Sequence, residues 1–204
     1  MKNYTLITLF VGATAFITSA HAEISGNLGV TSDYMWRGVS QNGGATAVSG
    51  GLDYTGTSFY AGTWISDASW AAGMDTEVDL YIGTEIGGFD VGVCKYMYPD
   101  AQTNDFTEIY VGYTFKGFDL SYAFDEDATS NEFYSIGYGF DIVEGLTGYV
   151  TFGAYDFTDT AADYDYIQLD IAYGDLTISL SEVDGDATAY DTDLNYVVSY
   201  GWGF

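Results

Sequence analysis

The end of the chain carries the clearest alternation of hydrophobic and polar positions. From Leu194 to Phe204, every second side chain is large and apolar, and those between are mostly small or polar. A period of two residues is typical of a β-strand, because successive side chains of a strand point to opposite faces. The apolar face consists of Leu194, Tyr196, Val198, Tyr200, Trp202 and Phe204. Lipid would solvate this face without further cover, so the pattern predicts the closing strand of a transmembrane β-barrel.

The same alternation divides the rest of the chain into further segments. In the first, residues 24–36, one parity is predicted to face lipid: Leu28, Val30, Tyr34 and Trp36. The other parity is predicted to face the barrel interior: Asn27, Thr31, Asp33 and Arg37. Together with residues 194–204, the remaining segments bring the total to twelve: 48–54, 59–65, 77–86, 89–93, 109–115, 118–124, 134–140, 146–152, 167–173 and 176–180.

The connections between these segments alternate in length. Short ones lie at 55–58, 87–88, 116–117, 141–145 and 174–175. Longer ones lie at 38–45, 66–76, 97–105, 125–131, 156–163 and 182–192. Outer-membrane barrels have this rhythm of periplasmic turns and extracellular loops. We therefore predict an all-β fold, a transmembrane antiparallel up-and-down β-barrel of about 12 strands with short periplasmic turns, longer acidic extracellular loops and no plug.

Aromatic residues gather at one end of the predicted strands. Next to a short connection or to the end of the chain lie Tyr54, Phe59, Phe89, Phe115, Phe118, Phe140, Tyr173, Trp202 and Phe204. Amphipathic rings are favoured at a membrane interface, so these residues are predicted to form a periplasmic aromatic girdle. The alternative is that tyrosine and phenylalanine are simply common in strands.

The start of the chain resembles an export signal. Lys2 precedes an apolar stretch from Leu6 to Ile17, and Ser19–Ala22 fits a small-x-small cleavage site. We expect residues 1–22 to be a cleaved signal peptide and residues 23–204 to form a single barrel domain in the bacterial outer membrane. Cys94 is the one cysteine, so no disulfide within the chain is expected.

The charge balance is strongly acidic. The chain has 30 Asp and Glu residues against 4 Lys and Arg, which excludes nucleic acid as an expected partner. High net charge can indicate disorder, but 18% aromatic and 48% hydrophobic residues argue against it here. The acidic residues must therefore be separated from the aromatic ones, as they would be in a barrel with acidic loops and an acidic interior.

One segment resembles a known family. Residues 32–41, read as SDYMWRGVSQ, closely resemble the SDYxxRGxSQ signature of the TorF family of proteobacterial porins. Residues 51–54, 59–64, 96–99 and 108–110 look like later blocks of that family. The resemblance implies an outer-membrane barrel that acts as a porin. It implies no established binding residues.

Catalysis is not expected from this composition. The single histidine, His21, lies in the predicted signal peptide, so the mature chain would have no imidazole for Ser-His or Cys-His chemistry. Glu77 and Asp79 are a possible carboxylate pair, but a spacing of two also makes them neighbours on one wet strand face. We expect no enzyme activity, no cofactor and no metal site.

The predicted interior is narrow and acidic. Closure geometry for twelve strands places the backbone about 12 Å from the axis. The residues predicted to line a pore are Asp33, Arg37, Asp53, Glu77, Asp79, Glu85, Asp90, Glu108, Asp119 and Asp170. Lys116 is expected near the periplasmic rim, and a bulge beside Cys94 would turn Lys95 inward. The sequence thus predicts passive diffusion of small solutes with cation selectivity. The alternative is that Arg37 and these acids pair internally and seal the lumen.

A second class of function is a closed structural or adhesive barrel that displays acidic loops. Its best support is the set of tyrosines at inward positions: Tyr81, Tyr110, Tyr149, Tyr155 and Tyr166. The expected partners are outer-membrane lipid and lipopolysaccharide, bridged to the loop acids by calcium or magnesium in one interpretation and free of such ions in the other. The loop acids are Asp125, Glu126, Asp127, Asp159, Asp163, Asp165, Glu182, Asp184, Asp186, Asp191 and Asp193. The aromatic C-terminal strand is expected to engage the barrel assembly machinery, and the oligomeric state is left open.

Overall fold

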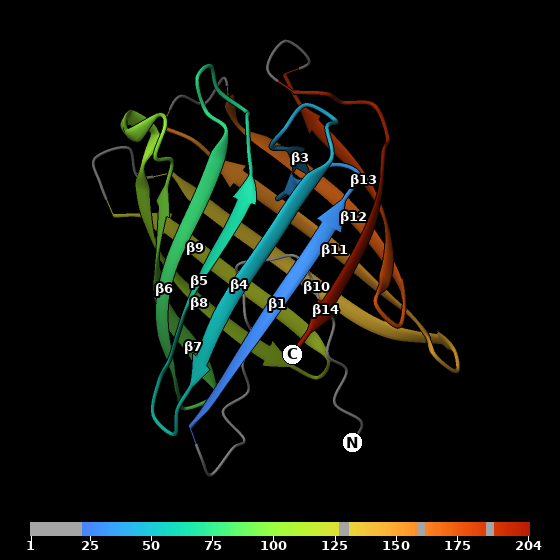
Figure 1. The fold of residues 1–204 in the computed structure, drawn as a ribbon. Helices are drawn as coiled ribbons and strands as arrows, with labels where there is room; N and C mark the ends of the chain where they lie inside the picture. Colours follow the sequence, from blue (N-terminus) through green and yellow to red (C-terminus); the bar gives the residue numbers. More distant parts are fainter. Residues whose placement is uncertain (1–21, 127–130, 159–161, 187–189) are drawn as a thin grey trace.

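The computed structural model describes residues 22–126, 131–158, 162–186 and 190–204, and these form a closed β-barrel (Figure 1). The wall consists of β1 (Glu23–Thr31), β4 (Ala47–Thr55), β5 (Tyr60–Asp67), β6 (Thr76–Ile86), β7 (Phe89–Met97), β8 (Phe106–Phe115), β9 (Phe118–Asp125), β10 (Glu132–Val143), β11 (Leu146–Asp156), β12 (Tyr164–Tyr173), β13 (Leu176–Gly185) and β14 (Asn195–Gly203). Residues 1–21 of the predicted signal peptide lie outside the described residues. Among those described, no helix is both long and apolar enough to cross a bilayer.

The barrel closes because β1 pairs with a strand on each side. Leu28 lies opposite Gly50 of β4 and opposite Trp202 of β14, and both pairings are antiparallel. Two backbone hydrogen bonds between Gly26 and Phe204, of 2.8 and 2.9 Å, join the last residue to the first strand. The other wall strands pair with their neighbours in sequence. The predicted antiparallel barrel of twelve strands is therefore confirmed.

Tight turns gather at one end of the barrel, here called the short-turn end. Gly87–Gly88 has φ of 63° and 88°, and Lys116–Gly117 has φ of 53° and 87°. Two successive positive φ values define a type I′ turn, whose twist matches that of the flanking strands. Longer segments join the strands at the opposite, long-loop end, and the C-terminus lies at the short-turn end (Figure 1).

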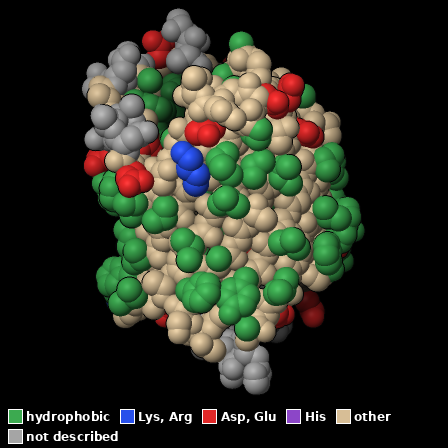
Figure 2. Space-filling model, turned by 60° about the vertical axis from the view of Figure 1, so that its left-hand side comes forward, with side chains coloured by type: hydrophobic (Ala, Val, Ile, Leu, Met, Phe, Trp, Pro, Cys, Tyr) green, Lys and Arg blue, Asp and Glu red, His purple; other side chains and the backbone are tan. Residues whose placement is uncertain are grey.

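The outer surface of the wall is apolar over most of its height. Figure 2 shows hydrophobic side chains spread over one side of the barrel, with acidic side chains gathered near the long-loop end. Outward residues of the central wall are exposed, among them Val48, Leu52, Ile65, Leu80, Ile82, Ile136, Phe152 and Val198. An exposed apolar band of this extent fits a hydrocarbon environment.

The predicted girdle residues lie on this outer surface near the short-turn end. Phe59, Phe89, Phe115, Phe118, Phe140, Tyr173, Trp202 and Phe204 are exposed, whereas Tyr54 is half-buried against the ring of Phe59. Stacking between Phe89 and Tyr113, with ring centroids 4.6 Å apart, links rings on neighbouring strands. That the predicted girdle residues lie at a membrane interface stays a prediction.

The prediction for the first segment was wrong beyond Thr31. Here β1 ends, and the chain turns into the barrel as a small hairpin of β2 (Met35–Trp36) and β3 (Val39–Ser40). Tyr34 is only 4% exposed and Trp36 is half-buried, so both face interior neighbours instead of lipid. The expected absence of a plug was also wrong, because this hairpin occupies part of the lumen. The physical reason is that its rings find aromatic partners on the inner wall, as described below.

Candidate functional site in the barrel lumen

The tip of the inward hairpin is Arg37–Gly38. Met35 pairs with Ser40 and Trp36 with Val39, which leaves these two residues as the turn. Their φ values of 50° and 83° give a type I′ geometry, in which Arg37 adopts a conformation unusual for a residue with a Cβ. A Cβ added at Gly38 would lie 2.6 Å from the Cβ of Tyr166, so glycine also permits a close approach to β12. The turn thereby projects the arginine deep into the lumen.

Arg37 forms a bidentate ion pair with Glu108 of β8. Its two terminal nitrogens donate to the two carboxylate oxygens at 2.7 and 2.8 Å, and the Tyr96 hydroxyl donates to the same carboxylate at 3.2 Å. The residues are 5% and 2% exposed. Burial alone would lower the pKa of the Arg37 guanidinium, but the Glu108 carboxylate outweighs burial and raises that pKa above its ordinary value. The guanidinium therefore stays charged while the ion pair fastens the hairpin to the wall.

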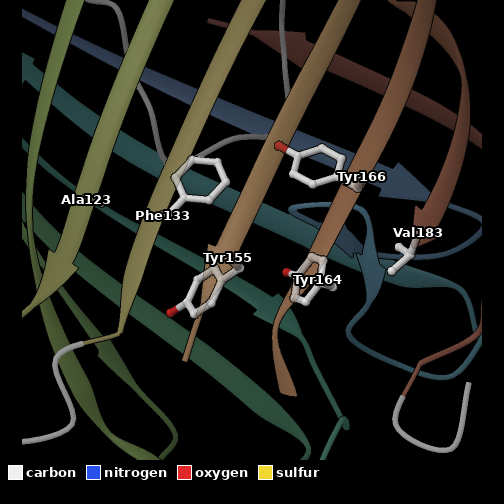
Figure 3. Close-up of a cluster of buried hydrophobic side chains, with 6 residues drawn as sticks. All are labelled: Ala123, Phe133, Tyr155, Tyr164, Tyr166 and Val183. Carbon is white, nitrogen blue, oxygen red and sulfur yellow. The ribbon is translucent and has the colours of Figure 1, made fainter. Parts of the chain in front are cut away.

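Aromatic rings surround the guanidinium. Its central carbon lies 3.9 Å from the ring centroid of Phe133, 4.1 Å from that of Trp36 and 5.1 Å from that of Tyr155. Figure 3 shows Phe133, Tyr155, Tyr164 and Tyr166 pointing into the barrel from neighbouring strands. Cations are attracted to aromatic faces, more strongly where water is excluded. The arginine is thus held by a charge partner and by an aromatic box.

Trp36 connects the hairpin to the packed interior. It packs against each of three buried clusters, which are centred on Tyr155 and Tyr166, on Cys94 and Tyr96, and on Tyr34 and Ala47. Its ring lies edge-on to Tyr96 at 5.8 Å and tilted against Tyr155 at 5.8 Å. The hairpin therefore narrows the lumen to a packed constriction at this level.

Most acidic side chains nearer the short-turn end accept hydrogen bonds from neutral hydroxyl groups. Tyr60 donates to Asp90 at 2.6 Å and Tyr149 donates to Asp119 at 2.8 Å, and Tyr81 donates to Asp53. Asp170 accepts hydrogen bonds from Ser179 at 2.5 Å and from Gln168. A tyrosine or serine fixes a carboxylate without cancelling its charge, so this part of the lumen remains acidic.

Glu77 and Asp79 lie side by side on the inner face of β6. Tyr34 of the inward loop donates to Glu77 at 3.0 Å, which adds a second polar attachment of this loop to the wall. Asp79 is fully buried, and neither of its carboxylate oxygens has a hydrogen-bond partner among the described residues. No group of three or more His, Cys, Asp or Glu side chains in the described part of the chain is arranged to hold a metal ion.

The structure separates the predicted pore residues into sets. Arg37 and Glu108 form an ion pair, Glu77 and Asp79 are neighbours on the inner face of β6, and Asp33 accepts a 2.7 Å hydrogen bond from Ser40 within the loop. Glu85 is exposed near the short-turn end. That all of these line an open path stays a prediction.

β7 has no bulge beside Cys94, so the condition under which Lys95 would turn inward is not met. The register of β7 is continuous with both neighbouring strands, and Lys95 lies opposite Leu80 and Thr107 on the outward parity. Cys94 itself is inward, as predicted, and buried. Lys116 sits in an exposed turn at the short-turn end, over the ring of Phe115.

Sequence reasoning identified Tyr155 and Tyr166 as inward tyrosines but missed the other rings of the site. The inward parity of β5, β7 and β10 would have identified Tyr60, Tyr96 and Phe133. Tyr34 and Trp36 carried no such signal, because their alternation continues that of β1. Only Gly38 hinted at a turn, because type I′ turns prefer glycine at their second central position.

A cavity of about 510 Å³ opens at the long-loop end, on the outer side of the hairpin. It is bordered by Asp105, Asp125 and several amide side chains. Its aromatic lining consists of Trp36, Trp70, Tyr98, Phe106, Tyr155, Phe157, Tyr164 and Tyr190. This cavity and the constriction beneath it are the candidate functional site.

Several solved structures resemble this barrel distantly. A mutant porin of Rh. blastica has 12% identity and a TM-score of 0.47, with 76% of this chain and 55% of the porin covered. OmpF of Salmonella typhi, in complex with daunomycin, has 9% identity and a TM-score of 0.43, with 90% and 97% covered. OccAB3 of Acinetobacter baumannii has 12% identity and a TM-score of 0.42, with 92% and 66% covered. Similarity this low carries no information on function.

A comparison with curated proteins found no significant match. The family comparison covers nearly the whole barrel. Residues 15–200 match the family model described as "Bacterial protein of unknown function (Gcw_chp)", and the chain belongs to this family.

Proposed function

We propose that this protein is an outer-membrane porin that admits small cationic solutes through a lumen narrowed by its first loop. The observation that carries the proposal is the contrast between the two sides of the wall. The outer side is apolar, whereas the inner side carries Asp53, Asp90, Asp119 and Asp170, whose hydrogen-bond donors are neutral. Such a lumen attracts cations and repels anions.

The buried arginine does not reverse this preference. Its charge is matched by Glu108 within 2.7 Å, so the pair contributes little net charge to the lumen. In this proposal the short-turn end faces the periplasm and the long-loop end faces outside. The sequence resemblance of residues 32–41 to the TorF porin family supports the same proposal.

The closed structural barrel is the second candidate, and the packed constriction favours it. Glu77, Asp79, Glu108 and Cys94 are each 2% exposed or less, so water has little access at this level when the hairpin is in place. The two candidates differ in whether ions cross the barrel.

A bilayer recording in a salt gradient tests the proposal. The reversal potential should show preference for the cation, and the double variant Asp53→Asn with Asp90→Asn should reduce that preference. Asp165→Asn serves as the matched control, because this carboxylate is exposed and lies on the outward parity of β12. A chloride preference would refute the selectivity, and an absence of conductance would favour the closed barrel.

The remaining partners also belong to this proposal. Carboxylates at the long-loop end, such as Asp163 and the β13 residue Asp184, would approach lipopolysaccharide phosphates, with divalent cations as bridges. The barrel assembly machinery would bind the C-terminal strand that ends at Phe204. Asp127 and Asp159, two of the predicted loop acids, lie outside the described residues. Chelation should lower the melting temperature of the barrel in lipopolysaccharide-containing membranes if the bridges form, and leave it unchanged otherwise.

A further inference from the structure

The cavity at the long-loop end combines aromatic rings with acidic side chains. Eight of its lining side chains are aromatic, and Asp105 and Asp125 add two carboxylates. None of the described lining residues is a lysine, arginine or histidine. Aromatic faces attract cations, and groups of such rings recognise quaternary ammonium ions. The lining is therefore complementary to a positively charged ligand with an apolar body.

The protein itself already binds an organic cation with two of these rings. Trp36 and Tyr155 line the cavity, and both belong to the aromatic box around the guanidinium of Arg37. The charge of Arg37 is matched by Glu108, so it does not oppose a second cation in the cavity. The same ring chemistry thus continues outward from the constriction.

Each of the two carboxylates accepts a hydrogen bond from a neutral donor. The backbone N–H of Tyr98 donates to Asp105 Oδ1 at 2.7 Å, and the side-chain amide of Asn131 donates to Asp125 Oδ2 at 2.8 Å. Neutral donors orient a carboxylate and leave its negative charge available. Groups fixed before the ligand arrives lose less conformational entropy on binding, which favours affinity.

The size and chemistry of the cavity distinguish between solute classes. A volume of about 510 Å³ lies within the range typical of small-molecule sites. A hydrated inorganic ion gains little from aromatic walls, and a neutral sugar can donate hydrogen bonds to the carboxylates but gains no charge attraction from them or from the rings. We propose that this cavity binds organic ammonium cations and thereby selects them at the channel entrance. This inference rests on the proposed function and names the solute class of the same site.

Binding is tested directly on the purified full chain in detergent. Choline is titrated while tryptophan fluorescence is recorded, because Trp36 and Trp70 line the cavity. The control ligand is the neutral alcohol of the same shape, in which carbon replaces the quaternary nitrogen. Choline should give a saturable change at a concentration about tenfold lower than the neutral alcohol requires, the factor expected for a charge-dependent contact.

A pair of variants tests how much the carboxylate charge of Asp105 contributes to choline binding. Asp105→Asn retains an oxygen acceptor for the Tyr98 amide but removes the charge, and it should weaken choline binding about tenfold. Asp165→Asn removes a carboxylate that lies outside the cavity lining and should leave the binding curve unchanged. Equal loss in both variants would show only a general electrostatic effect and would overturn the site.

Two further outcomes overturn the inference. One is equal binding of choline and the neutral alcohol, and the other is a fluorescence response to glucose but none to choline. The channel function is separate from these outcomes. A barrel that conducts cations without binding choline contradicts only the entrance site, whereas a barrel that binds choline without conducting contradicts only the channel.

Discussion

At the residue scale, Arg37 is the central group of the lumen. Its charge is buried in a barrel whose interior is otherwise acidic, and both terminal nitrogens are used by Glu108. Removing two charged groups from water costs free energy. The bidentate hydrogen bonds and the aromatic rings around the cation offset this cost. The loss of either partner would leave the other charge buried and unmatched.

Glu108→Gln should therefore destabilise the barrel by about 3 kcal/mol, since it leaves Arg37 without a counter-charge. The measurement is the urea midpoint of unfolding, followed by the difference in gel mobility between folded and unfolded forms. The double variant Arg37→Met with Glu108→Leu is the control, because it removes both charges and should recover most of the loss. A single variant that unfolds at the wild-type midpoint would contradict the importance of this pair.

Asp33 provides a prediction of pH dependence. Burial raises the pKa of its carboxyl above the ordinary value of 3.8, although a hydrogen bond from Ser40 opposes this. The folded state then holds its proton more tightly than the unfolded state, so stability falls as the pH rises through the raised pKa. Asp33→Asn should be at least as stable as the wild type at neutral pH, and the difference should shrink below pH 3.8. A wild type that gains stability relative to Asp33→Asn as the pH rises would contradict this sign.

At the element scale, the wall was predictable and the hairpin was not. A strand between lipid and lumen must alternate, so segments such as 77–86 show their inner and outer faces directly in the sequence. The hairpin obeys no such rule, because its environment is made by β7, β8, β10, β11 and β12 together. The alternation of Tyr34 and Trp36 continued that of β1, and nothing local marked the point where lipid ends and the lumen begins. The pairing of Arg37 with Glu108 likewise needed the closed barrel.

Gly38 and Gly43 form a matched pair for testing the hairpin. Both adopt positive φ, 83° and 63°, but a Cβ at Gly38 would clash with Tyr166 while one at Gly43 would meet nothing within 4 Å. Gly43→Ala should lower the free energy of unfolding by about 1 kcal/mol, because a residue with a Cβ is strained at positive φ. Gly38→Ala should lower it by at least about 2 kcal/mol, because the clash with Tyr166 is added to this strain. Chemical denaturation of the two variants under identical conditions measures the difference. Equal losses would show that the hairpin tip is not closely packed.

At the scale of the whole molecule, the barrel has its polar core inside and its apolar surface outside. The buried residues include Asp79, Glu77 and Glu108, whereas Ile24, Tyr196 and Phe204 are more than two-thirds exposed. This inversion means that folding in water alone would leave the apolar band uncovered. The purified chain should therefore require detergent, and its unboiled and boiled forms should migrate differently on a gel. Material that stays dissolved without detergent would contradict a membrane-spanning barrel.

Removal of the hairpin tests the constriction. A variant that lacks residues 35–40 should conduct more than the wild type, and a water-soluble thiol reagent should label Cys94, which is 1% exposed behind the packed rings. Asp165→Asn, at an exposed outward position of β12, serves as the control and should change neither property. If Cys94 stays unlabelled after the hairpin is removed, the wall side chains alone close the lumen.

The contact of the hairpin tip with β13 also constrains the order of biogenesis. Ser181 donates to the carbonyl oxygen of Gly38 across 143 positions of sequence, at 3.4 Å. This bond can form only after nearly the entire polypeptide has been delivered to the membrane. In sequence, the hairpin lies between β4 and β1, and β1 closes the barrel by pairing with β14. We therefore expect the hairpin to dock late, at the stage when β13 and β14 join the wall and close the barrel.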